Sequence, residues 1–154
     1  MEKVTGLNHV TFAVRDLKRS VEFYSDLLGF AIRMRGPSSA YLEAGTLWLA
    51  LVVDNNTKRV QSQEYSHVAF SVSPSGLPQV VARLKAAEIV SWQEADTQES
   101  FYFLDPDGHK LEIHSGDLRS RLAVRAALGE PGVVIREKNA KAQGSKVAKN
   151  FNHQ

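Results

Sequence analysis

Two short segments of this chain repeat one pattern of residues. Leu7–Val14 reads LNHVTFAV and Tyr65–Val72 reads YSHVAFSV, so His9 and His67 stand at the same position of the repeat, 58 residues apart. In each segment apolar side chains recur at every second residue, which is the pattern of a half-buried β-strand. The chain is therefore expected to contain two copies of one β-rich module.

The residues that follow the two strands also correspond. A helix is predicted after each: Asp16 can cap the first helix and Gly29 can end it, and Pro78 is tolerated in the first turn of the second. Further strands are predicted at 31–35, 40–43 and 47–53 in the first half and at 89–93, 100–104 and 110–114 in the second. Each half then reads strand–helix–strand–strand–strand.

Neither half alone is long enough to bury much apolar surface, so pairing of the halves about a pseudo-twofold axis is expected. The predicted fold class is α+β, with two paired βαβββ modules forming a curved mixed sheet around a metal site. The predicted boundaries are one domain over 1–128, with module one at 5–54, module two at 64–115 and a closing helix at 116–128, then a basic, flexible tail over 129–154.

Composition excludes several classes of function. The sequence has no cysteine, which rules out disulfides, zinc–thiolate clusters and a cysteine nucleophile. No stretch approaches the ~20 apolar residues of a membrane span and the N-terminus lacks the apolar run of a signal peptide, so a cytoplasmic protein without a membrane partner is expected. The tail carries five Lys/Arg against two acids but one aromatic, Phe151, so nucleic-acid binding is not expected.

The repeated histidines suggest a metal site. If the modules pair face to face, His9 and His67 converge, because a repeat places equivalent residues at symmetry-related positions. Glu112 lies in the last predicted strand, and an inward carboxylate needs a cationic partner. Imidazole nitrogen and carboxylate oxygen are good ligands for divalent first-row metals. Counted from the glycine before each last strand, Leu49 corresponds to Glu112 and offers no fourth ligand, so open positions typical of a catalytic site would remain.

A structural alternative stays open on these residues alone. A histidine in a strand is more often packed or solvated than metal-bound, and Glu112 could face solvent beside His114. His109 follows Gly108 in a turn and is expected to be exposed.

The sequence resembles the vicinal oxygen chelate superfamily, which includes glyoxalase I, extradiol dioxygenases and fosfomycin-resistance proteins, and within it the glutathione-using fosfomycin-resistance thiol transferases. The resemblance covers about residues 5 to 125. It is carried by GLNHVTFAVRDL, SVEFYSDLLGF, AYLEAGTLWLAL, YSHVAFSV and, most specifically, SFYFLDPDGHKLEIHSGDLRSRL.

This resemblance implies a metal-dependent transferase that adds glutathione to the epoxide of fosfomycin, a small phosphonate. It implies Mn(II) as the metal, with Mg, Zn, Ni or Fe as alternatives, and a homodimer with exchanged modules. A monomer that pairs its own two halves would satisfy the repeat equally well. The residues implied are the metal ligands His9, His67 and Glu112, the catalytic residues Thr11 and Tyr41, and the substrate contacts Trp48, Ser100, Tyr102 and Arg121.

One segment departs from the family pattern. Gln93 stands where the glutathione-using relatives have a lysine, and the loop after it lacks glycine and is acidic through Glu94, Asp96 and Glu99. Loss of a cation weakens the attraction for a dianion. The departure argues against the family's potassium site and leaves a related electrophile or another thiol possible.

Two other classes of function remain as alternatives. One is a different enzyme of the superfamily: an epoxide hydrolase, a glyoxalase I-like lyase, against which Leu49 argues, or an extradiol dioxygenase. The other is a non-enzymatic drug-binding resistance protein, and such proteins usually lack the metal triad.

Overall fold

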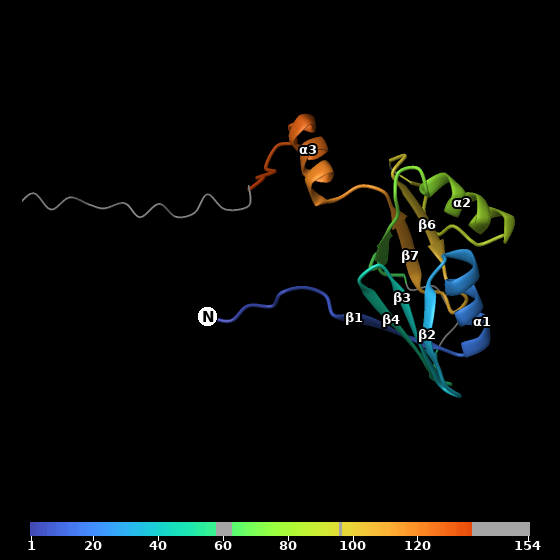
Figure 1. Ribbon diagram of the computed structural model, residues 1–154. Helices are drawn as coiled ribbons and strands as arrows, with labels where there is room; N and C mark the ends of the chain where they lie inside the picture. Colours follow the sequence, from blue (N-terminus) through green and yellow to red (C-terminus); the bar gives the residue numbers. More distant parts are fainter. Residues whose placement is uncertain (58–62, 96, 137–154) are drawn as a thin grey trace, which may run out of the picture. The chain divides into compact units, whose positions relative to one another are not determined.

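The structure is a computed structural model that describes residues 1–57, 63–95 and 97–136 (Figure 1). It divides into two compact units, Met1–Gly116 and Asp117–Gln154. The second unit contains helix α3 (Leu118–Leu128), which the Asp117 side chain caps at Ser120 N (2.7 Å) and which ends at Gly129 in the left-handed conformation. Most of the predicted tail lies outside the described residues.

The first module contains one sheet of four strands and one helix. Its elements are β1 (His9–Val14), α1 (Leu17–Glu22) with its π-helical continuation η1 (Phe23–Leu27), β2 (Ala31–Arg35), β3 (Ser39–Ala44) and β4 (Leu47–Val53). The strand order is β1-β4-β3-β2, with β1 parallel to β4 and the other pairs antiparallel. Asp16 caps α1 by accepting from Arg19 N at 3.0 Å, and Gly29 follows the helix with φ +80°, as predicted.

The second module repeats this topology with one strand fewer. Its elements are β5 (Val68–Ser71), α2 (Leu77–Ala86), β6 (Ser100–Leu104) and β7 (Lys110–His114). The order is β5-β7-β6, with β5 parallel to β7. Strands and helices thus form an α+β fold with mixed sheets, which confirms the predicted fold class. Across the described ranges, no helix is both long and apolar enough to cross a bilayer.

The predicted strand at 89–93 does not form. Val90 O accepts one backbone hydrogen bond, from Leu104 N at 3.0 Å, but the Ser91 side chain then takes the place of a second ladder bond, with its hydroxyl 2.8 Å from Tyr102 O. The same hydroxyl lies 2.9 Å from Gln93 O, which turns the chain away from β6. Local side-chain hydrogen bonding of this kind competes with sheet pairing.

The strand register corrects the predicted equivalence of Leu49 and Glu112. Thr11 pairs with Ala50 in the first sheet, and its repeat partner Ala69 pairs with Glu112 in the second, so Ala50 is the true counterpart. Counting from the glycines failed because two residues join β3 to β4 and five join β6 to β7. Alanine offers no ligand atom either.

The helix-bearing faces of the two sheets contribute to one hydrophobic core. Phe30 packs against Phe70 with ring centroids 5.2 Å apart, and Phe23 lies 6.2 Å from Phe103, so each contact joins the two modules. The strands alternate as expected: in β1, Phe12 and Val14 are buried on the core side. The opposite faces of the two sheets carry the residues predicted for the site, except for Arg121, which lies in α3.

Candidate metal and substrate site

Four of the predicted site residues share the open face of the first sheet. His9 and Thr11 are exposed on β1, Trp48 on β4 and Tyr41 on β3. The His9 ring lies 4.5 Å from Trp48, and the Tyr41 ring meets Trp48 edge-on at 5.0 Å. Pairing of β1 with β4 and of β4 with β3 brings these side chains together, since cross-strand neighbours share a face.

Four others gather on the second sheet. Glu112 on β7 pairs with Tyr102 on β6, and Ser100 lies two residues before Tyr102 on the same face. The His67 Nε2 atom lies 3.0 Å from Glu112 Oε2, and its ring lies 5.8 Å from Tyr102. Ser100, Tyr102 and Glu112 are all buried, with exposures of 6%, 3% and 6%. A carboxylate this buried requires a positive partner.

The hydrogen bonds of His67 indicate what that partner can be. Its Nδ1 lies 3.1 Å from the Tyr65 carbonyl oxygen, which can only accept, so Nδ1 carries the hydrogen and the neutral ring presents a lone pair at Nε2. That lone pair faces a Glu112 oxygen at 3.0 Å, an arrangement that a proton or a metal cation between the two atoms would stabilise. A second-shell carbonyl that fixes the tautomer is typical of metal-binding histidines. The donor pair therefore fits a divalent metal.

His9 has the same arrangement on the other sheet. Its Nδ1 lies 2.8 Å from the Asn8 side-chain oxygen, which leaves Nε2 as the ring nitrogen with a lone pair. Within the part of the chain that the structure describes, however, no three His, Cys, Asp or Glu side chains are grouped so that they could hold a metal ion. A single chain thus brings His67 and Glu112 together and places His9 beside Trp48, and the three-ligand set stays a prediction.

Comparison with known proteins identifies the family. Residues 6–113 match the model of the Glyoxalase/Bleomycin resistance protein/Dioxygenase superfamily. The chain belongs to this superfamily. The resemblance to its fosfomycin-resistance members is confirmed by the relatives that match. Glutathione transferase FosA of Serratia marcescens is 45% identical over 121 residues, covering 77% of this chain and 86% of the relative.

Two further proteins are similar to this chain. Metallothiol transferase FosB of Staphylococcus epidermidis is 39% identical over 125 residues, covering 78% of this chain and 90% of the relative. The crystal structure of the fosfomycin resistance protein FosX of Mesorhizobium loti superposes with a TM-score of 0.67 at 25% identity, covering 79% of this chain and 99% of that one.

The sequence did not predict several residues that lie around His67. Trp92 packs 5.7 Å from His67 and donates its indole N–H to Leu111 O at 3.0 Å. Tyr65 lies 5.3 Å from His67, and Lys110 extends over the Trp92 ring at 4.8 Å. Tyr65, Trp92 and Lys110 thus line one side of the site around His67. The alternation of β7 places Lys110 on the face of Glu112, but nothing in the sequence alone brings the segment around Trp92 onto this face.

Two other site predictions fall outside this geometry. Arg121 lies in α3 of the second unit, where its backbone N–H donates to Asp117 O at 3.0 Å. In the altered loop, the Gln93 amide donates to the Tyr65 hydroxyl at 3.4 Å, and Asp96 lies outside the described residues. The contact of Arg121 with a phosphonate and the status of the potassium site remain predictions.

The prediction that His109 is exposed was wrong. Its Nδ1 lies 2.7 Å from Asp105 Oδ2 and its ring stacks on Phe12 at 4.4 Å, leaving 26% of the side chain exposed. The same Asp105 oxygen accepts from the Tyr24 hydroxyl at 2.9 Å. Burial, and then the Asp105 carboxylate, raise the pKa of Tyr24 well above its ordinary value. The turn after β6 is therefore anchored on the first module, which sequence spacing did not reveal.

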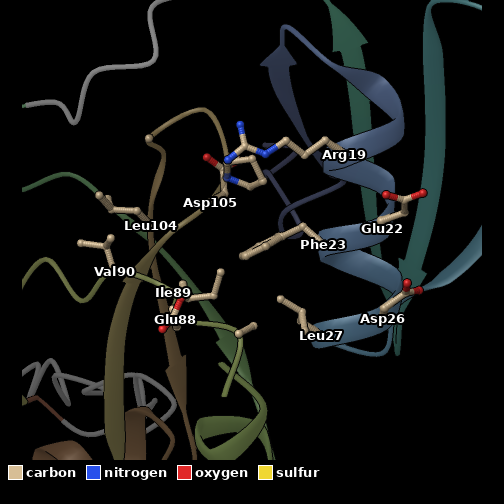
Figure 2. Close-up of a pocket in the computed structure, with 13 residues that line it drawn as sticks. Arg19, Glu22, Phe23, Asp26, Leu27, Glu88, Ile89, Val90, Leu104 and Asp105 are labelled. Carbon is tan, nitrogen blue, oxygen red and sulfur yellow. The ribbon is translucent and has the colours of Figure 1, made fainter. Parts of the chain in front are cut away.

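A groove lies beside this anchor, away from the predicted site. Figure 2 shows Phe23 and Leu27 on one side and Ile89 and Leu104 on the other. It encloses about 620 Å³, and none of the predicted site residues lines it. The residues predicted for the site lie instead on the opposite faces of the sheets, apart from Arg121 in α3.

Proposed function

We propose that this chain is a metal-dependent thiol transferase that adds glutathione to the epoxide of fosfomycin. The observation that carries the proposal is the buried His67–Glu112 pair in a chain 45% identical to a glutathione transferase, FosA, over 121 residues. The name metallothiol transferase of the second relative supports the dependence on a metal. Mn(II) is the metal proposed, held by His9, His67 and Glu112.

The metal and the predicted site residues would each have a separate role in opening the epoxide. When bound, the metal would supply Lewis-acid polarisation of the epoxide oxygen. Ser100, Tyr102 and Arg121 would hold the phosphonate by charge-assisted hydrogen bonds. The thiolate sulfur forms a bond to an epoxide carbon while that carbon's bond to oxygen breaks, and the alkoxide then takes a proton. Thr11 would lie beside this oxygen.

The remaining predicted residues lie on the first sheet. Tyr41 is 37% exposed and would assist ionisation of the thiol, and Trp48 at 38% exposure would line the pocket. Ala50, in the place of Glu112 in the repeat, leaves no fourth protein ligand, which supports a site open to substrate over one of the glyoxalase I type.

We further propose that two chains complete the site. The core packs the helix-bearing faces of both sheets together within one chain, and the faces with the predicted ligands lie opposite to it. A homodimer with exchanged modules would bring His9 of one protomer to His67 and Glu112 of the other. An isologous dimer would contain two such sites.

The activity is tested by mixing the purified protein with Mn(II), fosfomycin and a thiol, and following free thiol together with the phosphorus NMR spectrum. We expect metal-dependent loss of glutathione and a new phosphonate signal for the adduct. Cysteine and bacillithiol, tested in parallel, show whether the chain with Gln93 in place of the lysine uses a thiol other than glutathione. Product without thiol loss would indicate an epoxide hydrolase, and no product with any thiol or water would refute the proposal.

The metal ligand is tested separately. Glu112→Gln is expected to lower Mn(II) affinity at least 10-fold, because removal of a ligand charge costs more than removal of a second-shell partner. Glu22→Gln changes an exposed carboxylate paired with Lys18 at 3.8 Å and is the matched control. Equal Mn(II) affinity of both variants by titration would contradict the assignment.

A further inference from the structure

His114 holds two buried groups of the second sheet at once. Its Nδ1 lies 2.9 Å from the Ser100 hydroxyl oxygen and 3.4 Å from Glu112 Oε1. Ser100 and His114 are directly paired across β6 and β7, so the strand register fixes the contact. The His114 side chain is 18% exposed and that of Glu112 is 8% exposed.

The two contacts decide which nitrogen carries the hydrogen. An ionised carboxylate can only accept, so a lone pair on Nδ1 would face a second negative charge. A hydrogen on Nδ1 is attracted by Glu112 and can be accepted by Ser100 as well. The His114 ring is therefore expected to carry a hydrogen on Nδ1, with the Ser100 oxygen as an acceptor.

This tautomer has a consequence for Ser100. A hydroxyl that accepts from His114 keeps its own hydrogen for another partner, and Ser100 shares its face with Tyr102 and Glu112. With the hydrogen on Nε2 instead, Ser100 would donate its hydroxyl hydrogen to His114 Nδ1. The Ser100 oxygen would then offer only lone pairs to an anion and would repel it.

We propose that His114 is a positioning residue that aims the Ser100 hydroxyl at an oxyanion and holds Glu112 Oε1, leaving Oε2 toward His67. It rests on the proposed function for the identity of the anion, a phosphonate. The role is distinct from metal ligation, because His114 acts through Ser100 and Glu112.

The tautomer is tested on the wild-type protein loaded with diamagnetic Mg(II), by nitrogen-15 NMR of labelled histidine. We expect a hydrogen on His114 Nδ1. An Nδ1 without a hydrogen would overturn the proposal, whether or not fosfomycin proves to be a substrate.

Anion binding provides the second test, with inorganic phosphate and fosfomycin as probes. His114→Leu is expected to weaken binding of both about 10-fold, the value of one charge-assisted hydrogen bond. His114→Asn, which keeps an N–H near the Nδ1 position, is expected to restore most of it. In the Ser100→Ala background, the His114→Leu change should cost less anion affinity than it does in the wild type, since part of its effect passes through Ser100.

The outcomes separate this proposal from the proposed function. Additive losses in the double variant, no rescue by His114→Asn, or no binding of either anion by the wild type would overturn the role of His114. Thiol transfer by the wild type with unchanged anion binding in His114→Leu would overturn it while the proposed function stands. Coupled losses of phosphate binding without turnover of fosfomycin would support it while the proposed function fails.

Discussion

At the scale of single residues, Tyr24 shows how the fold ties its two halves together. The side chain is fully buried and donates to Asp105, which also accepts from His109 N at 2.8 Å and His109 Nδ1. The neighbouring Asp107 side chain lies 3.3 Å from Arg15 N in the first module. Breaking such a buried hydrogen bond costs about 1–3 kcal/mol.

Tyr24 also predicts a pH dependence of stability. Its pKa is raised in the folded protein, so its contribution is fully present below the unfolded pKa of about 10 and is lost as the pH rises toward the folded pKa. The free energy of unfolding should therefore fall above about pH 10. Urea unfolding from pH 8 to 11 measures this, and Tyr24→Phe should lack that part of the decline. Parallel profiles for both proteins would contradict it.

At the scale of elements, α1 depends on one cap. Asp16 accepts from Arg19 N at 3.0 Å, and α1 with its continuation η1 carries Val21 and Tyr24 into the core. Asp16→Ala should lower the free energy of unfolding by about 1 kcal/mol, because a backbone N–H loses its acceptor. Asp16→Ser, which keeps a capping oxygen, is the matched control in urea unfolding. Equal stability of the alanine variant and wild type would show that the cap is dispensable.

Local sequence signals predicted most elements. Asp16, Gly29 and the alternation around Phe12 and Phe70 act within a few residues, so helix ends and strands followed from them. The failures involve partners distant in sequence. The segment at Ser91 does not form a strand because the Ser91 hydroxyl donates to Tyr102 O. The counterpart of Glu112 was predicted wrongly because the β3–β4 and β6–β7 hairpins have loops of different length.

At the scale of the whole molecule, the repeat predicted that two histidines stand at equivalent positions but not which chains supply them. His67 reaches Glu112 within one chain, whereas His9 belongs to another sheet whose open face holds Trp48. Sequence periodicity specifies faces, and only the packing of the sheets determines which faces meet. The pairing of ligands between chains is for this reason a proposal with its own test.

Complementation between two inactive variants provides that test. In an exchanged dimer, one chain with His9→Ala and one with Glu112→Gln would form one site with both defects and one intact site. Coexpression should then restore about a quarter of wild-type activity if chains pair at random, since about half the dimers are mixed and one of the two sites in each is intact. Each variant alone should be inactive. No recovery in isolated mixed dimers would show that each site is built within one chain.

Ser91 has one more consequence, for colloidal behaviour. β6 is an edge strand of its sheet, and an edge strand with unpaired backbone groups can pair with other chains and cause aggregation. The Ser91 hydroxyl at Tyr102 O and the Val90 carbonyl at Leu104 N cap two of its backbone groups. The irregular segment around Val90 and Ser91 thus occupies part of the free edge of β6 without forming a strand. Ser91→Ala should therefore raise light scattering on heating relative to wild type.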